Sequence, residues 1–356
     1  MRIVFFGTPD FAIPALRRLT DRFDVALVVT RPDRPVGRRG RLTPPPVATM
    51  ARELDLDLFQ PANPNKLEAV EAIASYEPQA VVCVAYGRLL GTLLRRLAPP
   101  GILNAHPSLL PAYRGASPIQ GALLDGAHET GVTLIRLVRA LDAGPIVAVE
   151  QTPIDPDETA ADLHVRLANL TADLLAGVLP AWAAGELSEE PQDESKVSLT
   201  RPLERKDADL DLRQPALELY NRWRAFQPWP GVRVRAGDTI CGLTDVCPGN
   251  EQLEPGQVRL CDDALLLGCG DGSLSIRALQ PAGRTRMDAS AFARGYRRLL
   301  SVPWGRPYPD ARPPVLTYLD APLRCQSGSV LPLIPRRAAY RSDRAKRLAN
   351  RVFALV

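Results

Sequence analysis

The order of segments along the chain predicts an α/β fold: a Rossmann-like, doubly wound and mostly parallel sheet, followed by a small OB-like β-barrel domain. In the first half, short apolar segments with strand patterning alternate with segments of helical periodicity, which is typical of parallel sheets. Residues 207–300 instead hold five short β-patterned segments separated by Gly, Pro and Asp, as in a small closed barrel. With 356 residues, the chain is long enough for two such domains.

The first domain is expected to span residues 1–188. Its strands are predicted at residues 2–6, 25–30, 80–87 and 101–106, and its helices at residues 12–20, 44–54, 65–75, 88–96, 117–124 and 159–184. Two further strands, at residues 131–137 and 146–152, are joined by a short turn and predict an antiparallel hairpin at the sheet edge. The turn after the first strand lacks two of the three glycines of a dinucleotide-binding fingerprint, so the pattern disfavours a dehydrogenase.

Changes in composition set the remaining boundaries. Residues 189–206 are expected to form a linker, because the chain from Ser188 to Lys196 is polar and acidic. Residues 207–300 begin with a predicted helix at residues 215–226 and continue as the OB-like domain. Residues 301–356 form a Pro- and Arg-rich basic extension, with ten Arg or Lys against three Asp and thus a net charge of +7. Poor order is expected up to residue 335, and a basic amphipathic helix after Ser342.

The cysteines and the apolar segments exclude several classes of protein. The six cysteines have no Cys-x-x-Cys spacing and no neighbouring His, so we expect reduced and mostly buried thiols, with no metal site or disulfide. No apolar run is long enough to span a bilayer. The first residues resemble a strand and turn rather than a signal peptide, which favours a cytoplasmic location.

The segment from Leu103 to Gln120 holds the only Asn-x-His pair in the sequence. Because alternate side chains of a strand share a face, Asn104 and His106 are expected to point the same way. Pro107 ends this strand, and the loop after it is expected to shape the wall of a pocket. A polar pair at the carboxyl end of a strand lies where α/β folds place their chemistry. A lone His at such a place is more often structural than catalytic, so a catalytic interpretation depends on the residues around it.

This segment resembles a known family. Asn-Ala-His-Pro-Ser-Leu-Leu-Pro, followed by Arg114-Gly115, is similar to the active-site segment of formyltransferases that use 10-formyltetrahydrofolate. That family has a Leu-Asp-x-Gly turn downstream, which residues 141–144 match. The string Phe-Phe-Gly-Thr-Pro-Asp-Phe-Ala at residues 5–12 narrows the resemblance to the methionyl-tRNA formyltransferases, and strings at residues 225–231 and 279–283 agree. The resemblance covers residues 1 to about 300.

The resemblance implies a catalytic site made of Asn104, His106 and Asp142. An amine that attacks a formyl group creates an oxyanion and a cationic nitrogen. A neutral Asn amide suits the oxyanion, a His that titrates near neutrality suits the amine proton, and a carboxylate can orient the imidazole and handle a water. No metal is required. The implied folate-binding residues are Tyr86, Ser108, Leu109, Leu110 and Pro111.

Residues 31–41 form an expected loop with five arginines and one acidic residue, and without an apolar face to bury. Such a loop could be a solvated surface feature, but beside a pocket a role in phosphate contact is at least as consistent. In the resembling family this insertion contacts the acceptor stem of the initiator tRNA, which implies tRNA-binding roles for Arg34, Arg38, Arg39 and Arg41. The family usually has a Lys in the linker where this chain has Pro202.

The implied function is transfer of the formyl group of 10-formyltetrahydrofolate to the α-amino group of methionyl initiator tRNA, by a monomer. One alternative is a related formyltransferase that acts on an amino sugar or a nucleotide amine. The sugar enzyme should lack the arginine loop, and the nucleotide enzyme lacks a second domain. Another alternative is a non-catalytic protein that binds tRNA or folate, which the presence of all three catalytic positions argues against.

Overall fold

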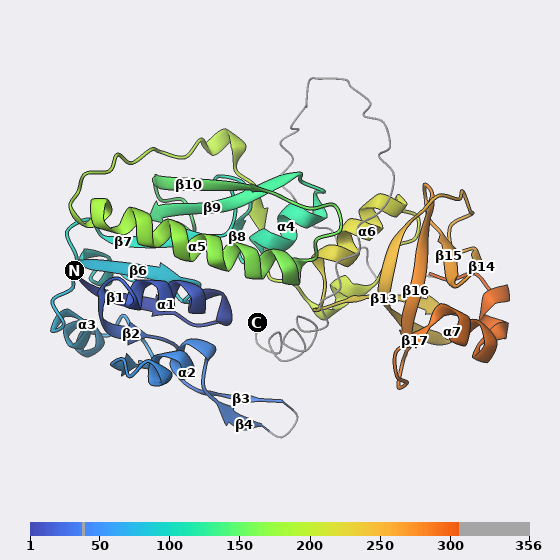
Figure 1. Cartoon of the computed structure of the whole chain (residues 1–356), viewed down its shortest axis with the longest axis horizontal. Coiled ribbons are helices and arrows are strands. Elements are labelled where there is room, and N and C mark those ends of the chain that lie inside the picture. The colour runs from blue at the N-terminus through green and yellow to red at the C-terminus, as the bar shows by residue number, and fades with distance from the viewer. Residues whose placement is uncertain (38–39, 306–356) are drawn as a thin grey trace.

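The computed structural model of the chain describes residues 1–37 and 40–305, and it divides into a larger and a smaller part (Figure 1). The larger part contains β1 (Arg2–Gly7), α1 (Ile13–Thr20), β2 (Asp24–Val29), β3 (Arg34–Val36), β4 (Arg41–Thr43), α2 (Pro46–Glu53), β5 (Leu58–Phe59), α3 (Leu67–Ala74), β6 (Ala80–Val84), β7 (Ile102–His106), β8 (Arg114–Gly115), α4 (Pro118–Leu124), β9 (Glu129–Arg136), β10 (Ile146–Pro153) and α5 (Ala160–Ala183). The smaller part contains α6 (Ala216–Ala225), β12 (Val232–Ala236), β13 (Thr239–Gly249), β14 (Val258–Cys261), β15 (Ala264–Gly268), β16 (Ser273–Pro281), β17 (Met287–Asp288) and α7 (Ala289–Gly295). Between them, the linker holds the short strand β11 (Leu199–Thr200).

A seven-stranded sheet forms the centre of the first domain, in the order β10-β9-β7-β6-β1-β2-β5. The strands from β7 to β5 are parallel, while β9 runs antiparallel to β7 and pairs with β10 as a hairpin at the edge. The predicted mostly parallel sheet with an antiparallel edge hairpin is confirmed. The order in which strands are added changes side at β1: β2 and β5 lie on one side of it, and β6 and β7, which follow in the chain, lie on the other. Open α/β sheets bind ligands at such a point, next to the carboxyl ends of the two central strands, here β1 and β6.

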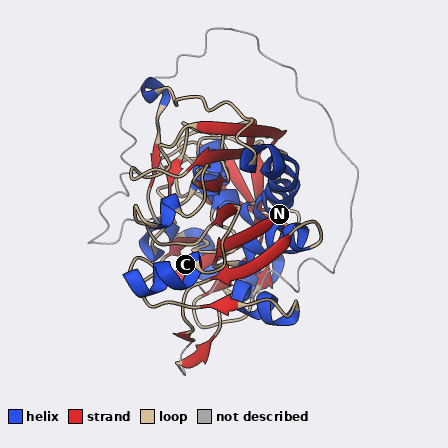
Figure 2. Cartoon of the chain, turned by 90° about the vertical axis from the view of Figure 1, so that its left-hand side faces the viewer, coloured by secondary structure: helices blue, strands red, loops and turns tan. Residues whose placement is uncertain are grey.

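Helices pack around the strands of this sheet (Figure 2), and its two faces have separate apolar cores. Alternate residues of β1 divide between them: Ile3 and Phe5 pack on the side of α1 and α5, and Val4 and Phe6 on the side of α3. The long helix α5 begins at a capping box, in which the Thr159 hydroxyl accepts from the Asp162 backbone N–H.

The prediction of a helix at residues 88–96 is wrong. Only a 3₁₀ turn at Leu94–Arg96 forms there, and Leu89 and Leu93 are 73% and 53% exposed, so they bury no apolar stripe. The segment is held by a distant side chain instead: Asn65 Oδ1 accepts from Gly91 N at 2.6 Å, and Asn65 Nδ2 donates to Leu89 O at 3.0 Å. These side-chain bonds replace the helical ladder. The connection from β6 to β7 is therefore an irregular loop beside the carboxyl end of β6.

The arginine loop predicted at residues 31–41 contains a two-stranded hairpin, β3–β4, which projects from the body of the domain (Figure 1). Arg34 pairs with Thr43, and Val36 with Arg41. Strands of three residues are too short to show a period of two, which is why the sequence did not reveal them. Arg38 and Arg39 lie outside the described residues.

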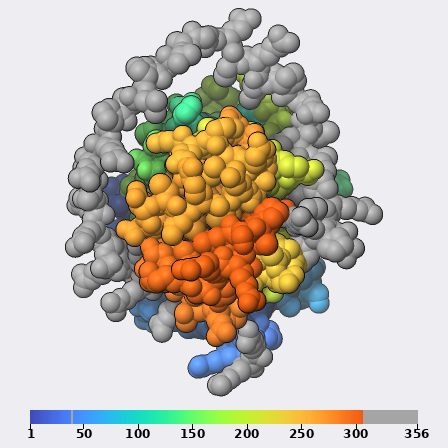
Figure 3. All heavy atoms as spheres, turned by 90° about the vertical axis from the view of Figure 1, so that its right-hand side faces the viewer, coloured from blue at the N-terminus to red at the C-terminus, as the bar shows by residue number. Residues whose placement is uncertain are grey.

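The second domain, whose orange atoms face the viewer in Figure 3, is an antiparallel sheet in the order β12-β13-β16-β15-β14, with β17 paired to β16. All five predicted strands are present. The ladder ends at β12 and β14, so closure of the predicted barrel does not come from these two strands pairing with each other. Residues Trp304 and Gly305 span the gap: Gly305 N donates to Arg235 O at 2.8 Å, and Trp304 N to Gly256 O at 2.9 Å. The Trp304 side chain is 3% exposed and packs edge-on against Phe292.

The two domains contact each other through α6. Tyr220 Oη donates to Asp157 Oδ1 at 2.7 Å, and the buried Arg224 donates to the carbonyl oxygens of Asp155 and Glu158. Residues 301–305, predicted to belong to the basic extension, complete the second domain, while the rest of that extension and its predicted helix lie outside the described residues. The proposed domain boundaries stay predictions.

The thiols, possible metal ligands and apolar helices are described here for residues 1–37 and 40–305. Five cysteines in this part are free thiols, and Cys83, Cys241 and Cys269 are buried. Within residues 1–37 and 40–305, no group of three or more His, Cys, Asp or Glu could hold a metal ion. In the same ranges no helix is both long and apolar enough to cross a membrane.

Candidate active site

Strand β7 brings Asn104 and His106 to one face of the sheet. Leu103 and Ala105 alternate with them and pack into the core on the α1 and α5 side. Asn104 and His106 therefore face the other side, and they are 8% and 5% exposed. Among the described residues, none forms a hydrogen bond with the Asn104 amide. A nearly buried amide without a protein partner is suited to donate to a bound substrate.

Asp142 reaches this face from the turn between β9 and β10. The residue has a positive φ of 49°, and its Oδ2 atom accepts from Gly115 N at 2.9 Å. The same oxygen lies 3.6 Å from His106 Nδ1. The structure thus brings Asn104, His106 and Asp142, which the sequence analysis named together, to one place.

The imidazole of His106 is oriented by a backbone carbonyl. His106 Nε2 lies 3.0 Å from Tyr113 O. Because a carbonyl oxygen only accepts, Nε2 carries the proton in this contact, and Nδ1 is the nitrogen left with a free lone pair in the neutral ring. The bond that sets the ring's orientation therefore comes from Tyr113, while Asp142 faces the nitrogen that is able to take up a proton.

Burial is the largest effect on the titration of His106, and it lowers the pKa below its ordinary value of 6.5. The negative charge of Asp142 and the bond to Tyr113 O raise the pKa again, and the positive charge of Arg114 lowers it. Cys83 on the adjacent strand stays a neutral thiol, because burial raises its pKa to about 12. Because burial lowers its pKa below 6.5, His106 is neutral at pH 7 and able to accept a proton.

Replacing Asp142 with Asn should lower the pKa of His106 further. The substitution keeps the size of the side chain but removes the charge that favours the imidazolium. An NMR titration of the imidazole C–H signals measures the effect, and the chain has only three histidines to assign. An unchanged or raised His106 pKa in a folded Asp142→Asn protein would contradict this electrostatic coupling.

The linker packs directly along the loop that follows β7, which the sequence analysis missed. Strand β11 pairs in parallel with β8, so Leu199 lies beside Arg114 and Thr200 beside Gly115. Tyr113 N donates to Ser198 Oγ at 2.8 Å, and this bond steadies the residue that orients His106. Partners 85 residues apart leave no local pattern, so periodicity could not have revealed them.

The implied folate-binding residues are placed unevenly. Tyr86 is 1% exposed and packs edge-on against Phe6, and burial raises its pKa to about 12. Ser108 is fully buried, and its hydroxyl donates to Ala112 O at 2.7 Å. Leu110 is 6% exposed, while Leu109 and Pro111 are half-buried. In the structure, Tyr86 and Ser108 are thus parts of the packed wall, with little surface of their own.

A cavity of about 580 Å³ reaches the start of the connection that carries Asp142, at Leu137 and Arg139, but none of the candidate site residues lines it. It lies between the irregular loop after β6 and the end of β9. Its lining includes Arg95, Arg96, Arg136, Arg139 and Glu189. Glu189 neutralises Arg136 through contacts of 2.8 Å. The remaining arginines leave this cavity positively charged.

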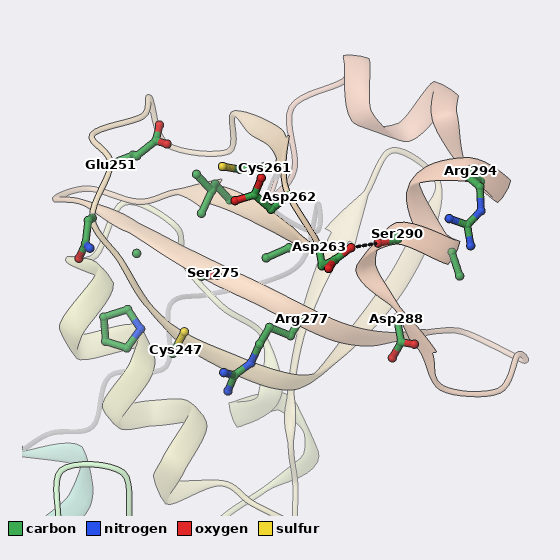
Figure 4. Close-up of a pocket in the computed structure, with 16 residues that line it drawn as sticks. Cys247, Glu251, Cys261, Asp262, Asp263, Ser275, Arg277, Asp288, Ser290 and Arg294 are labelled. Carbon is green, nitrogen blue, oxygen red and sulfur yellow. Dashed lines mark hydrogen bonds between the residues drawn. The ribbon is translucent and has the colours of Figure 1, made fainter. Parts of the chain in front are cut away.

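A larger cavity, of about 840 Å³, lies on the second domain between β14, β15, β16 and α7 (Figure 4). Its wall mixes acidic and basic side chains, and Ser290 Oγ donates to Asp263 Oδ1 at 3.1 Å. None of the residues named as candidate site residues lines it. Size alone therefore does not mark the reactive site.

Basic side chains gather near the carboxyl ends of β2 and β6. Arg31 is half-buried, and its pKa is lowered first by burial and then by the charges of Arg34 and Arg88. Its Nε atom is buried without a hydrogen-bond partner among the described residues. Neither Arg31 nor Arg88 was among the site residues predicted from the sequence. Arg31 follows the end of β2 by two residues and Arg88 follows the end of β6 by four, so both belong to loops at the carboxyl ends of these strands.

The fold agrees with comparisons to known proteins. Residues 1–179 match the model of the formyl transferase family, and residues 202–297 match that of the formyl transferase C-terminal domain. The chain belongs to the formyl transferase family of enzymes. Both models end before the basic extension.

Similar proteins have been named more narrowly. The methionyl-tRNA formyltransferase of Methylococcus capsulatus is 42% identical over 295 residues, which are 82% of this chain and 96% of that protein. The one from Thermus thermophilus is 43% identical over 298 residues, 83% of this chain and 96% of that protein. Among solved structures, an N-formyltransferase from Helicobacter canadensis, in complex with folinic acid and dTDP-3-aminofucose, has a TM-score of 0.60 at 16% identity. That match covers 77% of this chain and 97% of the other, and it supports the fold alone.

Proposed function

We propose that this protein transfers the formyl group of 10-formyltetrahydrofolate to the α-amino group of methionyl initiator tRNA, and thereby serves translation initiation. The observation that carries the proposal is the grouping of Asn104, His106 and Asp142 on one face of the sheet. Two relatives named methionyl-tRNA formyltransferase, which are 42% and 43% identical over more than four fifths of the chain, support the choice of acceptor. The enzyme acts as a monomer in the cytoplasm.

Asn104 stabilises the charge that develops on the formyl oxygen. Its amide lies at the carboxyl end of β7, nearly buried and without a protein partner among residues 1–37 and 40–305. A neutral donor already in place costs no reorganisation when the oxyanion forms, and it gains strength where water is excluded. Attack by an amine on a formyl group requires such a donor.

His106 takes the proton that the attacking amine loses, and returns it to the folate nitrogen when the bond from that nitrogen to the formyl carbon breaks. The lone pair on Nδ1 is available because Nε2–H donates to Tyr113 O. The imidazolium that results has its Nδ1 atom 3.6 Å from Asp142 Oδ2, and the negative charge of this carboxylate stabilises it. Asp142 is itself held by Gly115 N, so the carboxylate stays at this distance during the transfer.

The cavity at the amino end of β7 has the size and charge to take the far end of the folate co-substrate. It lies at that end because Gly101 and Arg136 line it and Arg136 pairs with Leu103, whereas the reacting formyl group lies at Asn104 and His106 near the other end of the strand. Ligand pockets commonly measure about 300–1,000 Å³, and this cavity has about 580 Å³. Folates end in a glutamate, whose carboxylates suit the neighbourhood of Arg95, Arg96 and Arg139. Ser108, Leu109, Leu110 and Pro111 then form the wall behind the reacting groups, with Tyr86 as support.

The tRNA is gripped by the β3–β4 hairpin and the second domain. The hairpin projects from the first domain and carries Arg34 and Arg41, both of which are exposed. Arg38 and Arg39 belong to the same basic group in the sequence. Phosphate contacts from such side chains position a nucleic acid without reading its sequence.

The direct test is formyl transfer from 10-formyltetrahydrofolate to methionyl initiator tRNA, with glycinamide ribonucleotide and an amino-sugar nucleotide as competing acceptors. Formylation of the tRNA alone supports the proposal. Preferential formylation of either small acceptor would replace it with the corresponding alternative enzyme, and binding without turnover would indicate a non-catalytic protein. Light scattering across a concentration series tests the monomer.

Replacing both Arg34 and Arg41 with Ala should raise the KM for tRNA and leave the KM for folate unchanged. The slope of log affinity against log salt concentration should also become shallower by roughly 1.4–1.8, for two lost phosphate contacts. Arg22→Ala, at the end of α1 and away from the hairpin, is the matched control. Equal losses toward tRNA and folate would place the hairpin in the folate site instead.

A further inference from the structure

Gln192, in the linker, connects the two loops on which the candidate active site depends. Its Nε2 donates to Asp142 O at 2.7 Å and to Gly144 O at 2.7 Å. Its Oε1 accepts from Arg114 Nε at 3.0 Å and from Arg114 Nη2 at 2.8 Å. The amide therefore joins the Asp142 turn to the loop after β7.

These four contacts use the full hydrogen-bonding capacity of the side chain. An Asn or Gln amide offers two N–H donors and an oxygen with two lone pairs, and Gln192 pairs each of them. Only an amide can serve two carbonyl oxygens at one end and a guanidinium at the other. A carboxylate has no donor for the carbonyls, and an ammonium has no acceptor for Arg114.

The linker around Gln192 is itself held to the first domain. Glu190 and Ile146 exchange backbone hydrogen bonds of 2.7 and 2.8 Å on one side of it. On the other side, Arg114 N donates to Ser198 O at 2.9 Å. Glu194 contributes a further contact to Arg114, with Nη2–Oε1 at 2.8 Å. A residue fixed at both ends can hold a turn in place, whereas a loose connection could not.

The Asp142 turn needs such support. Asp142 has a positive φ of 49°, a conformation that non-glycine residues seldom adopt unless their surroundings hold them there. The carbonyl oxygens bound by Gln192 belong to Asp142 itself and to the residue two positions later. Displacing this turn would move the Asp142 carboxylate relative to His106 Nδ1.

We propose that Gln192 is a positioning residue for formyl transfer, which holds the Asp142 carboxylate against His106 by bonding the backbone of the turn on one side and Arg114 on the other. The inference rests on the proposed function for its effect on turnover. Its effect on geometry holds independently of which amine is formylated.

Two variants separate the two halves of this contact. Gln192→Met keeps the length of the side chain and removes all four bonds. Gln192→Glu keeps the acceptor for Arg114 but turns the donors to the Asp142 and Gly144 carbonyls into an acceptor. Ser195→Ala is the matched control in the same segment, because the Ser195 hydroxyl bonds, among the described residues, only Asp193, at 2.6 Å. Near-ultraviolet circular dichroism establishes that each protein is folded.

Gln192→Met and Gln192→Glu should each lower kcat by about 10²-fold with little change in the KM for tRNA, since misplacement of a reacting group by about 1 Å costs that much. Ser195→Ala should remain within about twofold of the parent. Should Gln192→Met fail to fold, Gln192→Glu decides alone, because it keeps the contact to Arg114. Parental kcat in folded Gln192→Glu would overturn the proposal.

An NMR titration of His106 gives a readout that does not depend on turnover. In Gln192→Met the pKa of His106 should fall, because Asp142 no longer raises it from a fixed position. In Ser195→Ala it should stay at the parental value. An unchanged pKa in folded Gln192→Met would overturn the positioning role even if kcat fell. If the parent formylates no tRNA while the His106 pKa still responds to Gln192→Met, the proposed function fails and the positioning inference stands.

Discussion

Replacing His106 with Ala should lower kcat for formyl transfer by about 10²–10⁴-fold, the usual contribution of a positioned general base. The imidazole is the group whose free lone pair faces the site, and no other histidine lies on this strand. Activity of the parent should fall on the acid side only below pH 6.5. Burial lowers the His106 pKa, so the neutral base persists to lower pH, and protonation removes activity as the pH falls through that value.

His128→Ala is the control for this substitution, because His128 is exposed and distant along the chain from the site. His106→Gln keeps most of the buried volume and guards against a loss of activity through a cavity alone. A folded His106→Ala protein with near-parental kcat would remove His106 from the mechanism. An acid limb above pH 6.5 in the parent would contradict the lowered pKa.

Replacing Asn104 with Ala should lower kcat by about 10²–10³-fold, which is the measured range for losing one oxyanion donor. The KM values for folate and tRNA should change little, since the bond strengthens only as charge develops. Asn104→Asp keeps the size of the side chain and puts a negative charge where the oxyanion forms, so its kcat should be lower still.

Thermal unfolding of both Asn104 variants separates catalysis from stability. The Asn104 amide makes no bond to a described residue, so Asn104→Ala should unfold close to the parental temperature. Retained activity in Asn104→Asp would show that this position does not meet the oxyanion. A large rise in KM with unchanged kcat would instead make Asn104 a binding residue.

Short-range patterns in the sequence were sufficient for several elements. The strand of Asn104 and His106 was predicted because its apolar residues alternate with the two polar ones and Pro107 follows directly. Helix α5 was predicted because its apolar residues recur with the helical period over many turns. In both cases the residues that decide the structure are close together in the chain.

Other elements depend on partners far away in the chain. The helix predicted at residues 88–96 does not form, because Asn65 binds the backbone of that segment instead. Trp304 was assigned to an extension by composition, yet it packs on Phe292 and helps to bridge β12 and the start of β14. Composition and periodicity carry no information about such pairings.

For the site, the amino-acid sequence was sufficient to indicate which residues could act and which of them share a face. The two-residue period of a strand places Asn104 and His106 together wherever β7 lies in the fold. The groups that surround these two side chains could be identified from the folded chain alone. Gln192 meets Asp142 across 50 residues and Arg114 across 78, and the Tyr113 carbonyl meets the ring of His106 through the fold of a loop. These contacts set the tautomer, pKa and position of the groups, because hydrogen bonds and burial depend on distances in space rather than on separation along the chain.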